Sequence, residues 1–393
     1  MLKKICVFTG GRADYGLLKP LLDEIVNDQS LELRLLVSGM HLSSEFGLTY
    51  KNIEEDGFVC DEKVEMILSS DTSVSICKSM GLGMIGFSEA LERIKPDIFV
   101  ILGDRFESMV AATAALVCRI PVAHIQGGEL TFGAIDDQFR HAITKMSLLH
   151  FVTTNEYKKR VIQLGEEPSR VFNVGAINVD AMKRIKLLEK HELEKQINFS
   201  LGARTILVTF HPVTLEKGTA GKYFSQLLKA IDDIGGLKVI FTKTNADTDG
   251  RVINDLIDWY VEKNPKNAVA FTSLGQIRYI SALNYISAVV GNSSSGIIET
   301  PTFKVPTVNI GDREKGRVLA NNVITCKQSI KEIKQAIEKV LSEEFVDSIK
   351  NMINPYDKGE TAKNIVNTIK GYEIPSSTKK EFYDFSPTLL KEF

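Results

Sequence analysis

The chain has 393 residues, of which 44% are hydrophobic and 25% are charged. This is an ordinary globular composition, long enough for two domains with separate cores. Its formal net charge of −2 excludes an overall basic field that would attract nucleic acid or an anionic membrane. No window approaches the roughly 18 consecutive apolar residues that span a bilayer. We therefore expect no nucleic-acid or membrane partner, and any phosphate binding must be local.

The cysteines and the first residues favour a cytoplasmic protein. The five cysteines are widely spread, with no CxxC pair and no metal-ligand spacing, so a reducing compartment suits them. The opening MLKKICVFTGG holds a short apolar run that stops at glycines. Such a run is typical of a first strand rather than of a signal peptide.

Short apolar runs alternate with helical patterns along the chain, which is typical of parallel sheets covered by helices. In the first half we expect strands at residues 5–9, 32–38, 97–102, 121–125, 150–154 and 171–174. The helices expected between them include residues 14–27, 74–95 and 107–118, where apolar residues recur at threes and fours.

A highly charged stretch at residues 182–198 interrupts the alternation, as either a solvated helix or a connector. A second alternation follows, with strands expected at 205–210, 238–242, 268–272, 288–290 and 306–310. The predicted fold class is α/β, with two doubly wound Rossmann-like domains that face a cleft. We place the N-terminal domain at 1–180 and the C-terminal domain at 181–360. The segment 361–393, with a helix expected at 361–372, is predicted to return to the first domain.

The first predicted strand is followed by GGRADYGLL. The two glycines permit a tight turn, and the free N–H groups of the next helix would face a ligand. Arg12 could add a charge-assisted contact to a phosphate. A GxGxxG fingerprint is absent, so nicotinamide dinucleotides are not favoured. The alternative is an ordinary strand-to-helix turn with Asp14 as the cap.

The strand expected at 97–102 leads into LGDRFES. An aspartate at the carboxyl end of a buried strand is costly to hold unless its charge is used, and ligands of doubly wound sheets bind at this edge. Asp104 is therefore the leading catalytic carboxylate. Arg105 either contributes to the same site or serves as the ion-pair partner of Asp104.

The stretch GGELTFGAIDDQFRHAITK is densely polar. Glu129 follows two glycines that let the backbone approach a ligand closely. If a helix starts near Asp136, then Asp136 and Arg140 lie four residues apart on one face. Asp137 and His141 do so as well. These residues form either a capped helix with internal pairs or one wall of a site.

Two features of the second half fall at predicted strand ends. FHPVT places His211 after the strand expected at 205–210, on the side of the cleft. GNSSSGIIETP has the form of a strand, a turn of small residues and a helix N-terminus. Its serine hydroxyls and N–H groups could cradle a diphosphate, and plain N-capping by serine is the alternative.

Together these segments resemble the UDP-N-acetylglucosamine 2-epimerase family, specifically its hydrolysing members of sialic and legionaminic acid biosynthesis. The matching pieces are GGRADYG, SGMHL, KPDIFVILGDRFES, HIQGGE, IDDQFRHAITK, FHPVT, NAD at 245–247, GNSSSGIIE and a later GDR. They run in order from Arg12 to Arg313, and RADYG and RHAITK are the specific ones. The resemblance implies a glycosyltransferase-B-like fold, a UDP-sugar substrate, no metal or redox cofactor, and a homodimer or homotetramer.

The resemblance also implies residue roles. Asp104, Asp136 and Asp137 match acidic positions at the sugar, and His211 is expected at the diphosphate as a further catalytic group. Glu299 would contact the ribose, and Arg313 with Arg12 would contact the diphosphate. The full set of predicted substrate-binding residues is Arg12, Asp14, His41, Arg105, Arg140, His141, Asn245, Ser293, Ser294, Glu299 and Arg313.

One position departs from the family pattern. Many relatives have glutamate two residues after the strand histidine, whereas this chain has Gln126 after His124. An amide cannot act as a carboxylate base, so that role does not carry over. Glu129 is then the remaining local candidate.

The family reaction inverts C2 of the sugar, whose hydrogen is not acidified by any neighbouring carbonyl. As UDP leaves, positive charge grows at C1 and acidifies this hydrogen, so a carboxylate base can drive anti elimination to a glycal. Water then adds at C1 while C2 is reprotonated from the other face. This chemistry needs carboxylates whose pKa values are pushed apart, and donors on the departing diphosphate.

For UDP-N-acetylglucosamine and water, the expected products are N-acetylmannosamine and UDP. The first alternative is UDP-N,N'-diacetylbacillosamine as the substrate of the same hydrolysing reaction. The others are a non-hydrolysing epimerase that returns UDP-N-acetylmannosamine, an inverting glycosyltransferase, and a sugar-nucleotide-binding protein without turnover.

Overall fold

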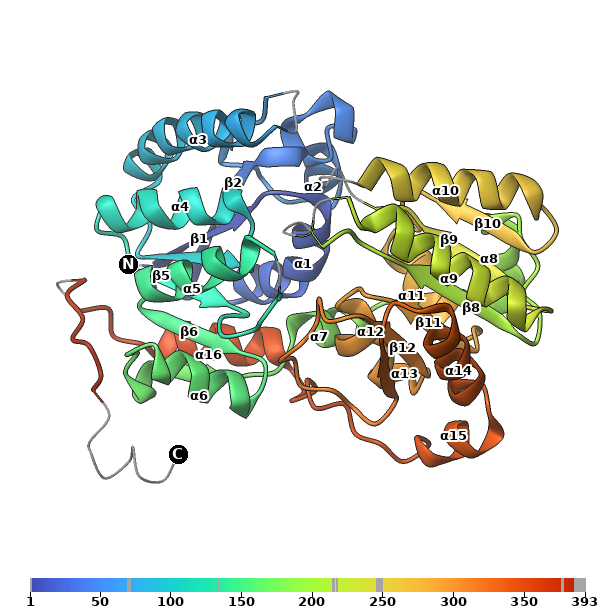
Figure 1. The fold of residues 1–393 in the computed structure, drawn as a ribbon. Helices are drawn as coiled ribbons and strands as arrows, with labels where there is room; N and C mark the ends of the chain where they lie inside the picture. The colour runs from blue at the N-terminus through green and yellow to red at the C-terminus, as the bar shows by residue number, and fades with distance from the viewer. Residues whose placement is uncertain are drawn as a thin grey trace. The chain divides into compact units, whose positions relative to one another are not determined.

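The computed structural model describes residues 2–68, 72–132, 134–213, 216, 218–244, 250–375 and 378–384. The chain divides into two compact units (Figure 1). Unit 1 comprises Met1–Glu129, Asp136–Ala181 and Lys358–Phe393, and unit 2 comprises Leu130–Ile135 and Met182–Asp357. Residues 130–135 thus group with unit 2, although the sequence placed them in the N-terminal domain. No helix among the described residues is long and apolar enough to cross a membrane.

The described part of unit 1 carries a seven-stranded parallel sheet in the order β3-β2-β1-β4-β5-β6-β7. Its first strand in the chain, β1, is internal and pairs with β2 on one side and with β4 on the other. The strands of this sheet are β1 (Lys3–Thr9), β2 (Leu31–Ser38), β3 (Glu62–Val64), β4 (Ile98–Leu102), β5 (Val122–Ile125), β6 (Leu149–Val152) and β7 (Val171–Asn173).

The described part of unit 2 carries a six-stranded parallel sheet in the order β10-β9-β8-β11-β12-β13. Here β8 is central and pairs with β9 and with β11. The strands of this sheet are β8 (Thr205–Thr209), β9 (Lys238–Thr242), β10 (Ala268–Phe271), β11 (Ala288–Gly291), β12 (Thr307–Ile310) and β13 (Val323–Cys326).

Helices join the strands of each sheet. The helices of unit 1 are α1 (Arg12–Asn27), η1 (Gly39–Leu42), η2 (Ser44–Phe46), α2 (Tyr50–Glu55), α3 (Ser73–Ile94), α4 (Phe106–Val117), α5 (Asp136–Met146), α6 (Asn155–Gln163), η3 (Pro168–Arg170), α7 (Ile177–Lys183, which runs on into unit 2) and α16 (Thr361–Gly371). The helices of unit 2 are α8 (Lys190–Ile197), α9 (Ala220–Ile234), α10 (Gly250–Lys263), α11 (Gln276–Leu283), α12 (Ser295–Ile298), α13 (Thr300–Phe303), α14 (Ile330–Val340) and α15 (Glu343–Ser348).

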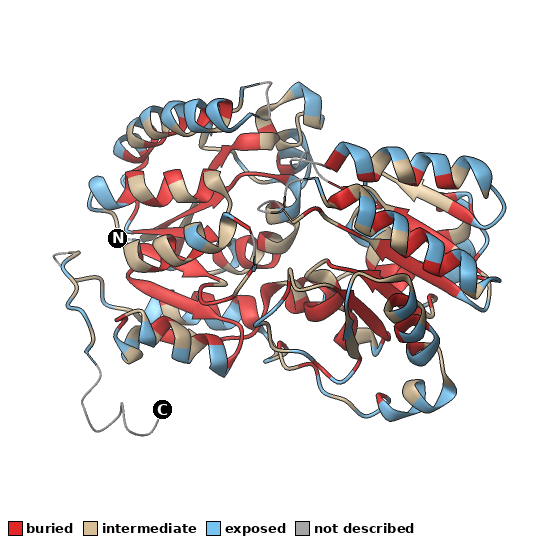
Figure 2. Ribbon diagram, viewed as in Figure 1, coloured by how far each residue is buried: buried red, intermediate tan, exposed pale blue. Residues whose placement is uncertain are grey.

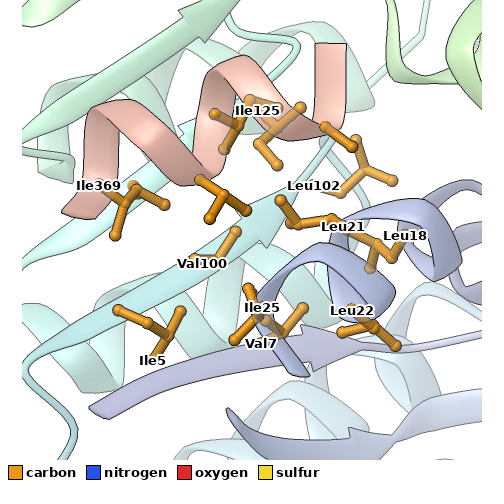
Figure 3. Packing of buried hydrophobic residues seen from close by; sticks show 14 of the residues in the cluster. Ile5, Val7, Leu18, Leu21, Leu22, Ile25, Val100, Leu102, Ile125 and Ile369 are labelled. Atoms are coloured by element: carbon orange, nitrogen blue, oxygen red, sulfur yellow. The ribbon is translucent and has the colours of Figure 1, made fainter. Parts of the chain in front are cut away.

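Each sheet forms the core of its own unit, with buried strands between helices that expose their outer faces (Figure 2). In unit 1 the apolar side of α1 presents Leu18, Leu21 and Leu22 to the sheet, at the spacing of one helix face (Figure 3). Val7 of β1 is fully buried against them. Burial on both faces is expected for parallel strands that helices cover, and it explains their continuous apolar runs.

The helix α16 completes the core of unit 1 from the far end of the chain. Its residue Ile369 packs in the same cluster as α1 (Figure 3). The hydroxyl of Thr361 donates to the carbonyl of Val174 at 2.9 Å. At the other end of the helix, the ammonium of Lys3 donates to the carbonyls of Ile369, Lys370 and Tyr372 at 2.8–3.0 Å. A cation there also suits the negative end of the helix dipole.

The predicted fold class is confirmed, and two strands that the sequence did not predict are β3 and β13. Both lie at an edge of their sheet. β3 reads EKV and β13 is only partly buried. β3 therefore lacks the apolar run that marks a buried strand, whereas β13 reads VITC and was missed although it is largely apolar.

Candidate active site

The predicted polar residues gather where the strand order reverses in each sheet. In unit 1 the order changes direction between β1 and β4, and in unit 2 between β8 and β11. At such a point the segments that follow the two strands diverge to opposite faces of the sheet and leave a crevice at its carboxyl edge. The segments after these four strands carry Arg12, Asp104, His211 and Ser293.

At the reversal in unit 1, Arg105 joins a cluster of acidic side chains. Its guanidinium donates from Nε and Nη2 to the carboxylate of Glu107, each at 3.2 Å. Burial works against the charged arginine, but Glu107, Asp14 and Asp136 outweigh it and raise the pKa of Arg105. The side chain of Glu107 is fully buried, so this cation and these acids balance one another.

Asp14 has a different role from the cap that was one reading of the sequence. Helix α1 begins at Arg12, two residues earlier than predicted, and its N-cap is Gly11, which has no side chain to cap with. Burial raises the pKa of Asp14 to about 6, with Glu107 adding to this effect and Arg105 opposing it. Asp14 therefore changes charge close to neutral pH, while Arg12 beside it is exposed.

Asp104 pairs with Arg140 and not with Arg105. Nη2 of Arg140, from α5, donates to Oδ2 of Asp104 at the end of β4. The reading of Arg105 as the partner of Asp104 is therefore wrong, because Arg105 turns to Glu107. Arg140 lies one helical turn from Asp136 in α5, as the sequence predicted, and its guanidinium reaches the end of β4. Arg140 is only 5% exposed, and the low dielectric of a buried site strengthens its attraction to Asp104.

The other predicted acids follow β5. Glu129 is 2% exposed and its carboxylate accepts the hydroxyl of Thr153, at the end of β6, at 3.0 Å. Asp136 and Asp137 form the first turn of α5. Asp137 lies 3.6 Å from Nε2 of His141, the spacing predicted from the sequence, and burial lowers the pKa of that histidine.

Two buried histidines connect the loops of this edge. The ring of His41 hydrogen-bonds the hydroxyls of Thr9 and Thr49 at 2.9 and 2.8 Å, and it is fully buried. Both ring nitrogens are thus used inside the protein, so the direct substrate contact predicted for His41 is not open to it. Burial lowers its pKa to about 4, and the neutral ring ties η1 to the end of β1.

His124 is held in the same way. Its Nε2 bonds the carbonyl of Gly103 at 2.7 Å and its Nδ1 bonds the hydroxyl of Thr144 at 3.1 Å. Burial lowers its pKa to about 3, so it is a neutral brace between β4, β5 and α5.

Gln126 is fixed by a second amide. Its backbone has a φ of 67°, which is unfavourable for a residue other than glycine. The side-chain Nε2 donates to Oδ1 of Asn178 in α7 at 2.6 Å. A neutral amide pair therefore occupies the position where the family pattern has a carboxylate.

In unit 2, Asn292 clamps the backbone of His211 across the strand reversal. Its Oδ1 accepts the His211 N–H at 2.7 Å, and its Nδ2 donates to the His211 carbonyl at 2.8 Å. Gly291 before it approaches β8 so closely that a Cβ there would lie 1.8 Å from the carbonyl oxygen of Thr209. Burial, with the charge of Arg313, lowers the pKa of His211 to about 3. Its imidazole is therefore neutral and offers a ring N–H rather than a cation.

Arg313 also reaches this clamp. Its Nη1 donates to the carbonyl of Asn292 at 3.1 Å and to the carboxylate of Glu314. Glu314 has a fully buried side chain and lies 2.6 Å from Nε of Arg317. Nη2 of Arg317 in turn donates to the hydroxyl of Thr131 at 3.4 Å. The segment 130–135, which directly follows Glu129, is thus held by the same loop that carries Arg313.

The serine turn leads into α12. Ser293 and Ser294 are half-buried, and the hydroxyl of Ser293 accepts the N–H of Ser295. The hydroxyl of Ser295 donates to Oε2 of Glu299 at 2.5 Å. The remaining predicted residue, Asn245, lies outside the described residues.

Glu107, Asn292 and Glu314 are among the residues of these networks that were not singled out from the sequence. Glu107 and Asn292 sit within matching motifs, and Glu314 directly follows the GDR motif. A charged or amide residue at a strand end next to an arginine or histidine was the available signal. Among the described residues, no group of three or more His, Cys, Asp or Glu side chains could hold a metal ion.

The comparisons with known proteins identify the family. The family model described as UDP-N-acetylglucosamine 2-epimerase matches residues 23–370. The chain belongs to this family. The family resemblance found in the sequence is therefore confirmed. Most of both units lies within the matched range.

Among relatives of this epimerase-family chain, the "GDP/UDP-N,N'-diacetylbacillosamine 2-epimerase (hydrolyzing)" of Campylobacter jejuni is 45% identical and covers 97% of this chain and 99% of its own. The "Polysialic acid biosynthesis protein P7" of Escherichia coli is 37% identical, covering 98% of both chains. The structure of UDP-GlcNAc 2-epimerase from Neisseria meningitidis bound to UDP-GlcNAc has a TM-score of 0.78 at 18% identity, covering 94% of this chain and 99% of that one. This last likeness shows the shared fold.

Proposed function

We propose that this protein is a hydrolysing UDP-sugar 2-epimerase, which releases UDP and a free sugar with inverted configuration at C2. The observation that carries the proposal is its 45% identity to a hydrolysing 2-epimerase over 97% of the chain. The polar groups at both strand reversals supply the chemistry that such a reaction needs. Acids gather in unit 1, and N–H, hydroxyl and guanidinium donors gather in unit 2.

Elimination across C1 and C2 needs a carboxylate that can take the C2 proton. Asp104, Glu129, Asp136 and Asp137 are the acids that we assign to this task and to the return of a proton from the other face. Asp104 forms a close ion pair with Arg140. Asp14, with a pKa of about 6, is a carboxyl that can hold a proton near neutral pH.

Departure of UDP needs donors at the diphosphate, because negative charge grows on the β-phosphate oxygen that separates from C1. We assign this role to Arg313, to the neutral N–H of His211, to the hydroxyls of Ser293 and Ser294, and to Arg12. The clamp on the His211 backbone orients that ring before the substrate arrives. Preorganised donors of this kind lower the barrier without a cost of reorientation during the reaction.

For the sugar, we propose that UDP-N,N'-diacetylbacillosamine is preferred and that UDP-N-acetylglucosamine is the second candidate. The name of the Campylobacter jejuni relative supports the first. The amide pair of Gln126 and Asn178 is consistent with it, because amides match the donor and acceptor of an acetamido group. UDP release from the two sugars, measured in parallel, decides between them.

The reaction is tested by UDP release in a coupled assay, run in D2O so that the sugar product is also analysed at C2. We expect deuterium at C2 and free sugar. Asp104→Asn should lower turnover at least about 100-fold, within the range of general base catalysis, and still bind UDP. Asp23→Asn, an exposed carboxylate of α1, is the matched control. UDP-linked product, a need for an acceptor, or unchanged turnover in Asp104→Asn would contradict the proposal.

We propose the cytoplasm as the compartment, supported by the cysteines, which are all free thiols. We also propose a homodimer or homotetramer. An exposed apolar stripe on α3, formed by Val74, Leu82 and Ile85, supports it. Light scattering at micromolar concentration gives the mass that tests it.

A further inference from the structure

Three side chains of unit 2 form a hydrogen-bond relay that the predicted site did not include. Tyr279 lies on α11, Ser295 begins α12, and Glu299 directly follows α12 as its C-cap. The phenol of Tyr279 bonds Oγ of Ser295. Oγ of Ser295 lies 2.5 Å from Oε2 of Glu299.

The direction of this relay follows from counting protons. A serine hydroxyl has one proton and a carboxylate has none, so Ser295 must donate to Glu299. Its proton is then committed, and the phenol of Tyr279 must be the donor in the other bond. The relay therefore runs from Tyr279 through Ser295 to Glu299.

The surroundings keep the relay in this state. Burial and the negative charge of Glu299 raise the pKa of Tyr279 above its usual range. The phenol thus keeps its proton throughout the pH range in which the protein would work. Ser295 and Glu299 are four residues apart, so the local helical turn places them on one face.

A carboxylate held in this way is suited to a ligand that brings two hydroxyl donors. A carboxylate only accepts hydrogen bonds, and the vicinal hydroxyls of ribose present two donors to one such group. We propose that Tyr279 and Ser295 are positioning residues, which hold the Glu299 carboxylate in the orientation that receives the ribose hydroxyls of the nucleotide. This inference rests on the proposed function, because it needs a nucleotide in unit 2.

The relay can be separated from a general structural role with two ligands. UDP carries the hydroxyl pair and 2′,3′-dideoxy-UDP lacks it, so the ratio of their dissociation constants reports the contact with Glu299. We would measure both constants by calorimetry for the full chain and for Tyr279→Phe and Ser295→Ala. Calorimetry gives the number of active sites per chain together with each dissociation constant. Each constant is therefore taken per active site, and the ratio does not depend on the fraction of folded protein.

We expect the unmodified protein to bind UDP more tightly than the dideoxy ligand. Each substitution should shrink this ratio by about 2- to 10-fold, the effect of one hydrogen bond, and leave dideoxy-UDP binding nearly unchanged. Tyr285→Phe is the matched control. It also removes a phenol that follows α11, but that phenol donates to the carbonyl of Leu188 at 3.1 Å, so the ratio should stay as in the unmodified protein.

Equal weakening of both ligands by Tyr279→Phe and Ser295→Ala would overturn the inference in favour of a structural role. A ratio near one in the unmodified protein would overturn it as well, because Glu299 would then not face the ribose. Failure to bind UDP at all would instead contradict the proposed function.

Discussion

Asp14 shares its surroundings with the charges of Arg105, Glu107 and Asp104, and its own charge costs more in the folded protein than in water. The pKa of Asp14 is about 6 in the folded protein and 3.8 in the unfolded chain, so the folded protein keeps this proton up to a higher pH. Stability gained from this proton is fully present below about pH 4. It is lost as pH rises through about 6.

Asp14→Asn should therefore stabilise the protein in a pH-dependent way. The amide resembles the protonated carboxyl, so we expect no change near pH 4 and a gain of about 1–3 kcal/mol at pH 7.5. Urea unfolding at the two pH values measures it. Asp23→Asn, at an exposed ion pair on the same helix, should show no such difference. A gain of the same size at both pH values would mean that the charge of Asp14 is not the cause.

At the residue scale, the sequence placed the polar side chains at strand ends but did not predict how they pair. Asp104 and Arg140 are 36 residues apart, and no spacing rule connects residues across a sheet. Spacing offered Arg105 as one possible partner for Asp104. In the structure buried Glu107 attracts Arg105, and Asp104 pairs with the arginine of α5. Pairing of this kind depends on tertiary packing.

At the scale of elements, the buried carboxylate of Glu166 joins segments that are far apart in the sequence. One of them is residues 378–384, which we call the C-terminal arm. The Glu166 carboxylate accepts from Lys145 at 2.6 Å, from Lys380 at 2.7 Å and from His150 at 3.0 Å. Its side chain is 2% exposed. Although burial opposes the charge, these three partners lower the pKa of Glu166 to about 2. Phe382 continues the arm and packs its ring against Gly165.

Glu166→Gln should destabilise unit 1 near neutral pH. It leaves two ammonium groups without their shared carboxylate, and we expect a loss of about 3 kcal/mol. Since the folded pKa lies below the ordinary 4.5, the stabilisation is present above about pH 4.5. The difference from the unmodified protein should fade as pH falls toward 2. Urea unfolding across this range tests it. The exposed neighbour Glu167→Gln is the control, and an equal loss there would contradict the argument.

The elements themselves were predictable where burial on both faces leaves a continuous apolar run. The strand expected at 238–242 coincides with β9 at both ends. The ends of the other internal strands differ from the predicted ones by a few residues. The edge strand β3 was missed because its sequence EKV holds no apolar run, whereas β13, which reads VITC, was missed although it is largely apolar. The segment 130–135 could not be assigned either. Its grouping with unit 2 depends on Arg317 and Gly316, which are far away in the sequence.

At the scale of the whole molecule, the chain crosses between its two units directly beside two of the acids that we assign to the reaction. The chain passes between units after residues 129, 135, 181 and 357. The first two passages flank the segment that is held by the loop of Arg313, and they lie directly beside Glu129 and Asp136. A nucleotide that orders the Arg313 loop would therefore act on a segment continuous with two of the assigned acids. This connection follows from the covalent chain alone.

UDP should stabilise the protein through the Arg313 loop. A ligand that binds only the folded state at 100 times its dissociation constant adds about 2.7 kcal/mol. For a unit of this size that raises Tm by about 5–10 °C. Differential scanning fluorimetry with and without UDP measures the rise. Arg313→Ala should remove most of it, because the guanidinium that we assign to the diphosphate is lost. Arg204→Ala, an exposed arginine that precedes β8 at the opposite edge of the sheet, should keep it. Equal rises in the unmodified protein and in Arg313→Ala would show that the diphosphate is held elsewhere.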